Sequence, residues 1–250
     1  MNNPPPWLKA DQTTDPTAPT GIRRLGRNLL HNGLIFDFGA WAYAWMTGNP
    51  TWQANSARLL DTVVGQTEGV QVLDLGAGPG NSALAMGQNR PQASFIAFDL
   101  AQQMLETAAH NRVRAGWSAQ RLALVRGDAL RLPFANASVD VVTGHSFLYL
   151  LPDYQGVLGE AQRVLRPGGQ IAFLEPHAGL ADWQWLSRQD SLPLLVSISL
   201  WRVYSWLHRR FSPARLHADL TTAGFEQIET EVTLGGFGIF GRARKPSQKE

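Results

Sequence analysis

Short apolar runs alternate with longer amphipathic stretches through the middle of the chain. Five runs are short and apolar, as buried strands are, and three stretches between them are long enough to be helices that cross back over a sheet. The strands are expected at 70–75, 93–98, 121–126, 139–143 and 169–174, and the helices at 80–89, 101–115 and 153–165. This alternation predicts an α/β fold with a doubly wound, Rossmann-like, mostly parallel sheet.

The end of the chain breaks this alternation. Residues 225–232 and 237–243 are two strand-like runs separated only by residues 233–236, which leaves no room for a helix. The two runs are therefore expected to form a C-terminal antiparallel hairpin, which brings the sheet to seven strands. The α/β domain as a whole is expected to span residues 69–250.

Two segments precede this domain. Residues 21–68 are expected to form an N-terminal helical cap, because leucines recur there at helical spacing and Asn49-Pro50 is typical of an N-cap followed by the first position of a helix over 51–64. Residues 1–20 combine five Pro with Asn, Asp and Thr. They are expected to be a disordered tail.

The segment between the fifth strand and the hairpin, residues 177–211, is expected to be a helical lid insertion. A helix over 194–208 would gather apolar side chains on one face. These are Val196, Leu200, Val203 and Leu207. Residues 191–218 contain no Asp or Glu but carry four Arg and two His. Two interpretations stay open: a lid helix packed on the domain, or a segment over 192–216 that receives a lipid-like or anionic molecule or contacts an anionic membrane surface.

Composition narrows the classes of function. The formal net charge is +2, which lacks the strong basic bias of a general nucleic-acid binder. The absence of Cys excludes disulfides, thiolate metal sites and catalysis by a Cys nucleophile, and no clustering of His with acids predicts a metal site. The start of the chain lacks the features of a signal peptide, and no run approaches the roughly 20 apolar residues of a spanning helix. A cytoplasmic protein is expected, with peripheral membrane contact as the open alternative.

A glycine-rich loop follows the first predicted strand. The strand carries Asp74, and the loop runs through Gly76, Ala77, Gly78 and Gly80 into the next helix. Glycines at a strand-to-helix turn let backbone N–H groups approach a ligand closely. The third glycine stands one position earlier than in the Gly-x-Gly-x-x-Gly fingerprint of dinucleotide-binding folds, and Asp74 would repel a pyrophosphate. The loop therefore favours an amino-acid zwitterion over a phosphate.

Two more carboxylates stand at the ends of the next two predicted strands. Asp99 follows the second strand, where a carboxylate can accept both hydroxyls of a ribose, and Asp128 follows the third, where it can accept the exocyclic amine of an adenine. Because the carboxyl ends of parallel strands meet at one edge, the loop and the two acids outline one elongated ligand that contains adenosine.

Several stretches carry a family resemblance through their order and spacing. They are 72–80, 98–100 with Met104-Leu105, 127–134, 138–142 and 163–169. On these stretches the chain resembles the class I S-adenosylmethionine-dependent methyltransferases, in the group that includes ubiquinone/menaquinone C-methyltransferases and small phospholipid N-methyltransferases. The resemblance implies S-adenosylmethionine as cofactor and methyl transfer to O, N or C of a small, hydrophobic or lipid-like acceptor.

The resemblance also implies a set of cofactor-binding residues. The set is Tyr43, Asp74, Gly76, Ala77, Gly78, Gly80, Asp99, Leu100, Met104, Asp128, Ala129 and His145. The glycines would lie along the methionine part of the cofactor, and Asp99 would bind the ribose. Asp128 with Ala129 would hold the adenine, on whose ring Met104 would pack. Tyr43 would reach the cofactor from the helical cap.

Two histidines are candidates for a general base. His145 follows the fourth strand and His177 follows the fifth, and an imidazole changes charge near neutral pH. An ordinary hydrogen-bonded histidine is the alternative at each position, because the sulfonium is already activated and alignment supplies much of the rate. A nicotinamide-dependent oxidoreductase and a non-catalytic S-adenosylmethionine-binding protein stay open as alternative functions. Methylation of nucleic acid is not expected, because residues 144–147 lack the Asn/Asp-Pro-Pro-Tyr/Phe run of adenine amino-methylation.

Overall fold

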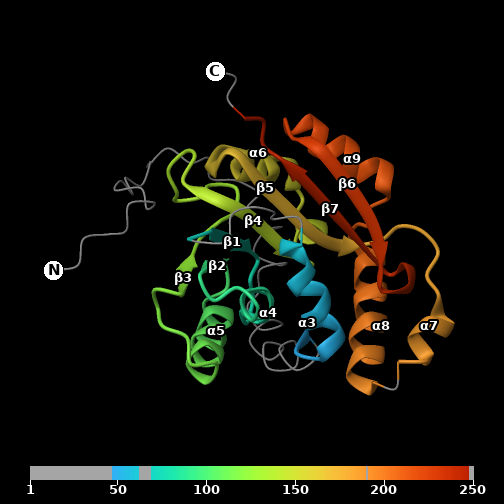
Figure 1. Cartoon of the computed structure of the whole chain (residues 1–250). Helices are drawn as coiled ribbons and strands as arrows, with labels where there is room; N and C mark the ends of the chain where they lie inside the picture. The colour runs from blue at the N-terminus through green and yellow to red at the C-terminus, as the bar shows by residue number, and fades with distance from the viewer. Residues whose placement is uncertain (1–46, 62–68, 190, 248–250) are drawn as a thin grey trace, which may run out of the picture.

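Strands from the middle and the end of the chain form one seven-stranded sheet with helices on both faces (Figure 1). The computed structural model describes residues 47–61, 69–189 and 191–247. The strands are β1 (Gln71–Leu75), β2 (Ser94–Asp99), β3 (Leu122–Arg126), β4 (Val139–His145), β5 (Leu165–Pro176), β6 (Glu226–Thr233) and β7 (Gly238–Arg244). The helices are α3 (Pro50–Ala57), α4 (Asn81–Gly87), α5 (Gln102–Arg114), α6 (Tyr154–Val164), α7 (Trp183–Ser187), α8 (Leu192–Leu207) and α9 (Pro213–Thr222), with short 3-10 turns η1 (Arg58–Leu60), η2 (Leu148–Leu150) and η3 (Leu234–Gly236).

The strand order is β3-β2-β1-β4-β5-β7-β6. Strand β1 lies inside the sheet, next to the central strand β4, and pairs in parallel with β2 on one side and β4 on the other. Strand β7 runs antiparallel to both β5 and β6. The predicted mostly parallel sheet with a C-terminal antiparallel hairpin is confirmed. The winding reverses between β1 and β4, and the loops that leave the carboxyl ends of these two strands diverge there. Ligands of open α/β sheets bind at this switch point.

Two strands extend further than the apolar pattern predicts. Strand β4 continues through His145, which pairs with Leu174 of β5. Strand β5 begins at Leu165, which pairs with Val139 across a register shift. His145 is therefore the last residue of a central strand and not part of the loop that follows it, so the sheet fixes the position of its backbone.

The central strands are buried on both faces. Val72, Leu73 and Leu75 of β1 have no exposed surface, as expected for a parallel strand covered by helices. Helices α3, α4 and α5 lie on one side of the sheet and α6 and α9 on the other (Figure 1). The loops at the carboxyl edge therefore rest on a rigid base.

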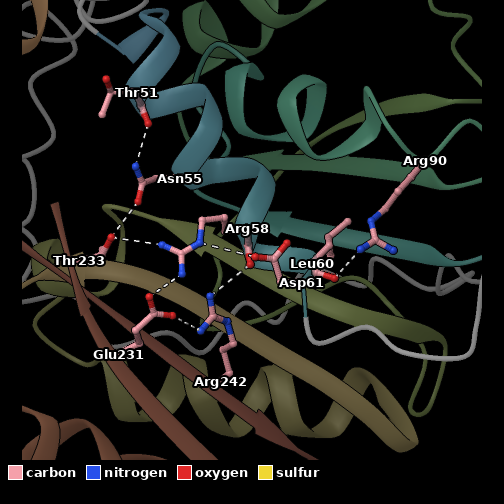
Figure 2. Close-up of polar contacts among 9 residues, drawn as sticks. All are labelled: Thr51, Asn55, Arg58, Leu60, Asp61, Arg90, Glu231, Thr233 and Arg242. Carbon is pink, nitrogen blue, oxygen red and sulfur yellow. Dashed lines mark hydrogen bonds and ion pairs between the residues drawn. The ribbon is translucent and has the colours of Figure 1, made fainter.

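Helix α3 is held against the hairpin from the far end of the chain (Figure 2). The side-chain oxygen of Asn49 accepts a hydrogen bond from the backbone N–H of Trp52, as the Asn-Pro pair predicts. Just after the helix, Arg58 donates to the Glu231 carboxylate, to which Arg242 of β7 donates at 3.0 Å. Arg242 also donates to the backbone carbonyl of Arg58 at 3.3 Å. This network joins the first described helix to β6 and β7.

The same network explains the lowered pKa of Glu231. Burial acts to raise the pKa of Glu231, but hydrogen bonds from Arg58 and Arg242 outweigh it and lower that pKa.

The helix predicted over 51–64 ends as an α-helix at Ala57 and tightens into η1. Residues 62–68 lie outside the described residues.

Helix α8 confirms the helix expected in the insertion, but it packs through a different face. The buried side chains are Leu194, Ser197, Ile198, Trp201 and Ser205. Three members of the predicted apolar face, Leu200, Val203 and Leu207, are exposed instead. The helix is apolar around most of its circumference, so periodicity alone could not determine which side packs. Across the described parts of the chain, no helix is long and apolar enough to span a membrane.

Three arginines of the insertion donate to backbone carbonyls. Arg202 donates to His177 O at 2.6 Å and to Gly179 O at 2.8 Å. Arg209 donates to a loop carbonyl at 2.8 Å, and Arg210 to the carbonyl of Arg202 at 2.6 Å. The bond of Arg209 fixes the end of the insertion to the domain, whereas the bonds of Arg202 and Arg210 lie within the insertion.

Candidate active site

The glycine loop after β1 follows a backbone path that favours glycine. Gly76, Gly78 and Gly80 have φ of +63°, +52° and +78°, in the left-handed region. A Cβ on Gly76 would lie 2.3 Å from Cδ2 of Phe147. Both the backbone conformation and the contact with Phe147 therefore exclude a side chain at Gly76. Ala77, between the first two glycines, is buried.

Asp99 joins the glycine loop to the ends of the neighbouring strands. Its two carboxylate oxygens accept hydrogen bonds from the backbone N–H groups of Gly78 and Ala101, both at 2.8 Å. The N–H of Gly127, after β3, donates to the backbone carbonyl of Asp99 at 3.1 Å. Burial raises the pKa of Asp99, although the N–H groups that it accepts oppose the shift. The structure thus brings the loop, Asp99 and the end of β3 together, as the sequence predicted.

The residues predicted to hold the adenine differ in exposure. Met104 on α5 and Ala129 after β3 are buried, whereas Leu100 is exposed. Asp128 is exposed, and its carboxylate accepts the backbone N–H of Leu130 at 3.0 Å. The exposed Asp128 carboxylate is available to an exocyclic amine, and the packing of an adenine ring on Met104 stays a prediction.

Asp74 lies beneath the loop. It is fully buried, and its oxygens accept hydrogen bonds from the hydroxyls of Ser82 on α4 at 2.6 Å and Thr143 on β4 at 2.9 Å. Burial raises its pKa to about 6, against the effect of the two hydroxyls. Asp74 therefore holds three elements around the loop, and direct contact with a ligand stays a prediction.

An aromatic cluster stands at the carboxyl end of β4. The ring of His145 lies 4.9 Å from that of Trp52 on α3, which lies 5.1 Å from that of Trp201 on α8. The indole N–H of Trp52 donates to the hydroxyl of Ser197 at 2.8 Å. We call Trp52, His145 and Trp201 the aromatic cluster. It joins the cap helix, the sheet and the insertion.

Two polar atoms of the aromatic cluster are buried without a partner. Among the described residues, neither Nε2 of His145 nor Nε1 of Trp201 has a hydrogen-bond partner. Burial lowers the pKa of His145 to about 4, so the imidazole is neutral near pH 7. An unsatisfied buried polar atom costs stability, and a catalytic role, a bound ligand or an ordered water are the usual reasons for one in a native protein.

Glu175 on β5 holds the loop that follows β4. It is fully buried, and its carboxylate accepts the backbone N–H groups of Phe147, Leu148 and Tyr149 at 3.0, 2.8 and 3.2 Å. Burial raises the pKa of Glu175 to about 7, opposed by these three N–H groups and by the charge of Arg209. Phe147 packs against Gly76. Glu175 therefore supports the glycine loop indirectly, through the loop that follows β4.

The other predicted site residues lie elsewhere. His177 follows β5, and its Nδ1 lies 3.0 Å from the carbonyl oxygen of Gly236, to which it donates. That bond ties the start of the insertion to η3, so the role of His177 as a base stays a prediction. Tyr43 lies outside the described residues, as do the tail over 1–20 and most of the predicted cap.

Comparison with known proteins agrees with this geometry. Residues 73–173 match the family model described as a methyltransferase domain. A demethylmenaquinone methyltransferase from Deinococcus radiodurans is 38% identical over 180 residues, which are 68% of this chain and 73% of that protein. The chain belongs to the class I S-adenosylmethionine-dependent methyltransferases. This membership sets aside the nicotinamide-dependent and non-catalytic alternatives.

Two further matches differ in acceptor. A malonyl-[acyl-carrier protein] O-methyltransferase from Xylella fastidiosa is 37% identical over 124 residues, which are 49% of this chain and 41% of that protein. The matched part of this chain therefore covers less than half the length of the Xylella fastidiosa relative. The solved structure of Haemonchus contortus phosphoethanolamine N-methyltransferase 2 in complex with S-adenosylmethionine matches with a TM-score of 0.66 at 19% identity, over 88% of this chain and 60% of that one. At this identity the match shows the shared fold.

The residues at the carboxyl edge fit the cofactor of this methyltransferase, S-adenosylmethionine. The glycine loop offers a backbone path that favours glycine, Asp99 offers a carboxylate for a ribose, and Asp128 offers an exposed acceptor for an adenine amine. Within the described ranges, no group of three or more His, Cys, Asp or Glu could hold a metal ion.

Sequence reasoning missed several residues that shape the methyltransferase site. Trp52 and Trp201 lie far from His145 in the sequence, and no spacing rule joins them. Glu175 stands in the run Glu175-Pro176-His177, of which only the histidine was predicted as a site residue. An acidic residue near the end of an otherwise apolar strand was the signal that could have identified it, because a buried carboxylate needs donors.

Proposed function

We propose that the methyltransferase modifies a small hydrophobic acceptor that contacts the aromatic cluster. The observation that carries this proposal is Nε2 of His145, which is buried at the carboxyl end of β4 and has no hydrogen-bond partner within the described residues. Strand β4 pairs with β1, whose loop fits the cofactor. An acceptor bound to His145 would therefore lie beside the cofactor loop, at the switch point of the sheet.

We assign His145 the role of orienting the acceptor and receiving its proton. With its pKa lowered to about 4, the imidazole is neutral near pH 7, and Nε2 accepts a hydrogen bond from a hydroxyl when the ring proton is on Nδ1. S-adenosylmethionine, when bound, supplies a methyl group that its sulfonium has already activated. An imidazole with so low a pKa is a weak base, so alignment of the acceptor contributes more than proton transfer.

We infer that the acceptor is a flat, oxygen-bearing, quinone-like ring. Trp52 and Trp201 pack edge to face with ring centres 5.1 Å apart, and an acceptor ring would pack against the same aromatic cluster. Nε1 of Trp201 is a free donor among the described residues, so a ring oxygen could accept from it while a hydroxyl donates to His145. The name of the Deinococcus radiodurans relative, a demethylmenaquinone methyltransferase, supports this class of acceptor. We also propose a cytoplasmic location at the membrane surface and no nucleic-acid partner.

The acceptor is tested by incubating the enzyme with methyl-labelled S-adenosylmethionine and a lipid extract of its source, then locating the label by mass spectrometry. Label in a hydroxylated ring lipid is expected, and label only in an amine or a carboxylate would contradict the quinone-like acceptor. The Asp99→Ala variant is the matched control for the cofactor, because loss of the carboxylate should abolish the calorimetric signal of S-adenosylmethionine binding and the labelling together.

A further inference from the structure

The outward side of α8 is apolar and exposed. Helix α8 has 16 residues, and its buried side chains face the aromatic cluster and the sheet. We call its exposed apolar residues the outer face of α8. They are Leu192, Leu195, Leu200, Val203, Tyr204, Trp206 and Leu207, with exposed fractions of 67, 41, 53, 60, 42, 73 and 65%.

The arrangement differs from that of an ordinary surface helix. A surface helix keeps charged or polar residues on its outward side, whereas a helix that is apolar all round is normally covered. Val203 and Leu207 stand one helical turn apart, with Trp206 beside them, so the exposed side chains are contiguous. A contiguous apolar patch of this kind marks an interaction site.

Charge indicates which partner the outer face fits. Residues 191–218 carry four Arg and no acid. Arg215 is paired with Asp219 at 2.9 Å, and the charge of Arg209 acts on the carboxylate of Glu175. Arg202 and Arg210 donate to backbone carbonyls, which carry no net charge to cancel theirs. The helix therefore combines exposed apolar side chains with a positive charge at its C-terminal end, as helices that lie on anionic membranes do.

We propose that the outer face of α8 docks on an anionic phospholipid surface. The aliphatic side chains enter the boundary between head groups and acyl chains, and Trp206 and Tyr204 suit that depth because each has an apolar ring with a polar group. The arginine charges attract the lipid phosphates. Since Trp201 on the opposite side of α8 belongs to the aromatic cluster, docking places the proposed acceptor site beside the membrane. Only this last consequence rests on the proposed function.

The surface is tested with the full chain and vesicles, without cofactor or acceptor. Cosedimentation with phosphatidylglycerol-containing vesicles is expected, with weaker binding to pure phosphatidylcholine and release at high salt. Failure to bind phosphatidylglycerol vesicles, or equal and salt-insensitive binding to both lipids, would overturn the proposal. Because methyl transfer is not measured, this failure is distinct from a failure of the proposed acceptor.

Substitution locates the binding surface. A double variant, Val203→Glu with Leu207→Glu, should weaken vesicle binding at least about tenfold, since two apolar side chains no longer enter the lipid. Val113→Glu on α5 is the matched control, because Val113 is 70% exposed on a different helix, and it should bind vesicles like the unchanged protein. Calorimetric binding of S-adenosylmethionine checks that each variant is folded, and Trp206→Ser replaces the double variant if that one does not fold.

The competing occupant of the outer face is a second copy of the chain. Light scattering in the absence of lipid should show a monomer for both the unchanged protein and the double variant. A dimer that the double variant dissociates would assign the outer face to self-association and overturn the lipid proposal.

Discussion

The two sides of the active site differ in how far the protein satisfies its own polar groups. On the cofactor side, both oxygens of Asp74 and both oxygens of Asp99 accept hydrogen bonds from neighbouring groups. On the acceptor side, Nε2 of His145 and Nε1 of Trp201 are buried without a partner in the described chain. A side that is already hydrogen-bonded keeps its shape before any ligand binds. A side with unpaired atoms discriminates among ligands, because only a ligand with matching polar groups removes the penalty.

Breaking the cofactor side should have the largest effect. Gly76→Ala places a Cβ 2.3 Å from a ring carbon of Phe147 at a φ of +63°. The left-handed backbone and the overpacking together should lower the free energy of unfolding by about 3 kcal/mol or more, measured by urea denaturation. Gly159→Ala on α6 is the control: a Cβ there meets nothing within 4 Å and φ is not positive. That variant should be neutral or stabilised by up to about 1 kcal/mol. Equal stabilities of the two variants would refute the role of the Phe147 contact.

The second effect concerns Glu175, whose carboxylate holds the loop after β4 against the glycine loop. Burial raises the pKa of Glu175 from 4.5 to about 7, so folding favours its protonated form. The resulting stability is fully present below pH 4.5 and is lost as the pH rises through about 7, by on the order of 3 kcal/mol. The free energy of unfolding measured from pH 4.5 to 7.5 should therefore fall more steeply for the unchanged protein than for Glu175→Gln. Parallel curves would show that Glu175 does not titrate in this range.

The third effect sharpens the contrast on the acceptor side. His145→Phe keeps a ring but removes the free acceptor and should lower kcat about 100-fold, about 2.7 kcal/mol, without changing the Kd of S-adenosylmethionine. Steady-state kinetics and calorimetry separate the two quantities. The matched control is His110→Phe, at an exposed histidine on α5, which should leave both unchanged. A weakened cofactor Kd in the His145 variant would place this histidine on the cofactor side instead.

The smallest effect tests whether the hairpin positions the aromatic cluster. Glu231→Gln leaves the buried Arg242 without its carboxylate and should cost about 1 kcal/mol of stability, since Glu231 itself is partly exposed. It should also raise the acceptor KM modestly, because the network holds α3, which carries Trp52. Glu226→Gln, at an exposed position of the same strand, is the control for both measurements. The pKa of Glu231 is lowered, so the stability that the pair adds is present above the unfolded-state pKa and lost as the pH falls below it.

Local pattern was sufficient for the cofactor side because its parts are contiguous. Gly76, Gly78 and Gly80 lie within one turn, Asp99 ends β2, and Asp128 stands two residues after the end of β3. Parallel strands with helical crossovers bring such ends to one edge whatever the details of packing. The alternation of strands and helices also determined the fold class, including the terminal hairpin.

Tertiary structure decided everything that depends on which distant groups meet. Trp52 reaches His145 because α3 is held by Arg58 against β6 and β7 and by Ser197 of α8. Glu175 finds its three donors because β5 lies beside β4. Periodicity could not predict which side of α8 faces outward, because apolar residues occur on nearly every side of that helix. The sequence by itself determined the sheet, the glycine loop and the two acids at the strand ends, since these follow from spacing along the chain. Burial, unpaired atoms and the exposed face of α8 arise from contacts between distant segments, which only the folded chain determines.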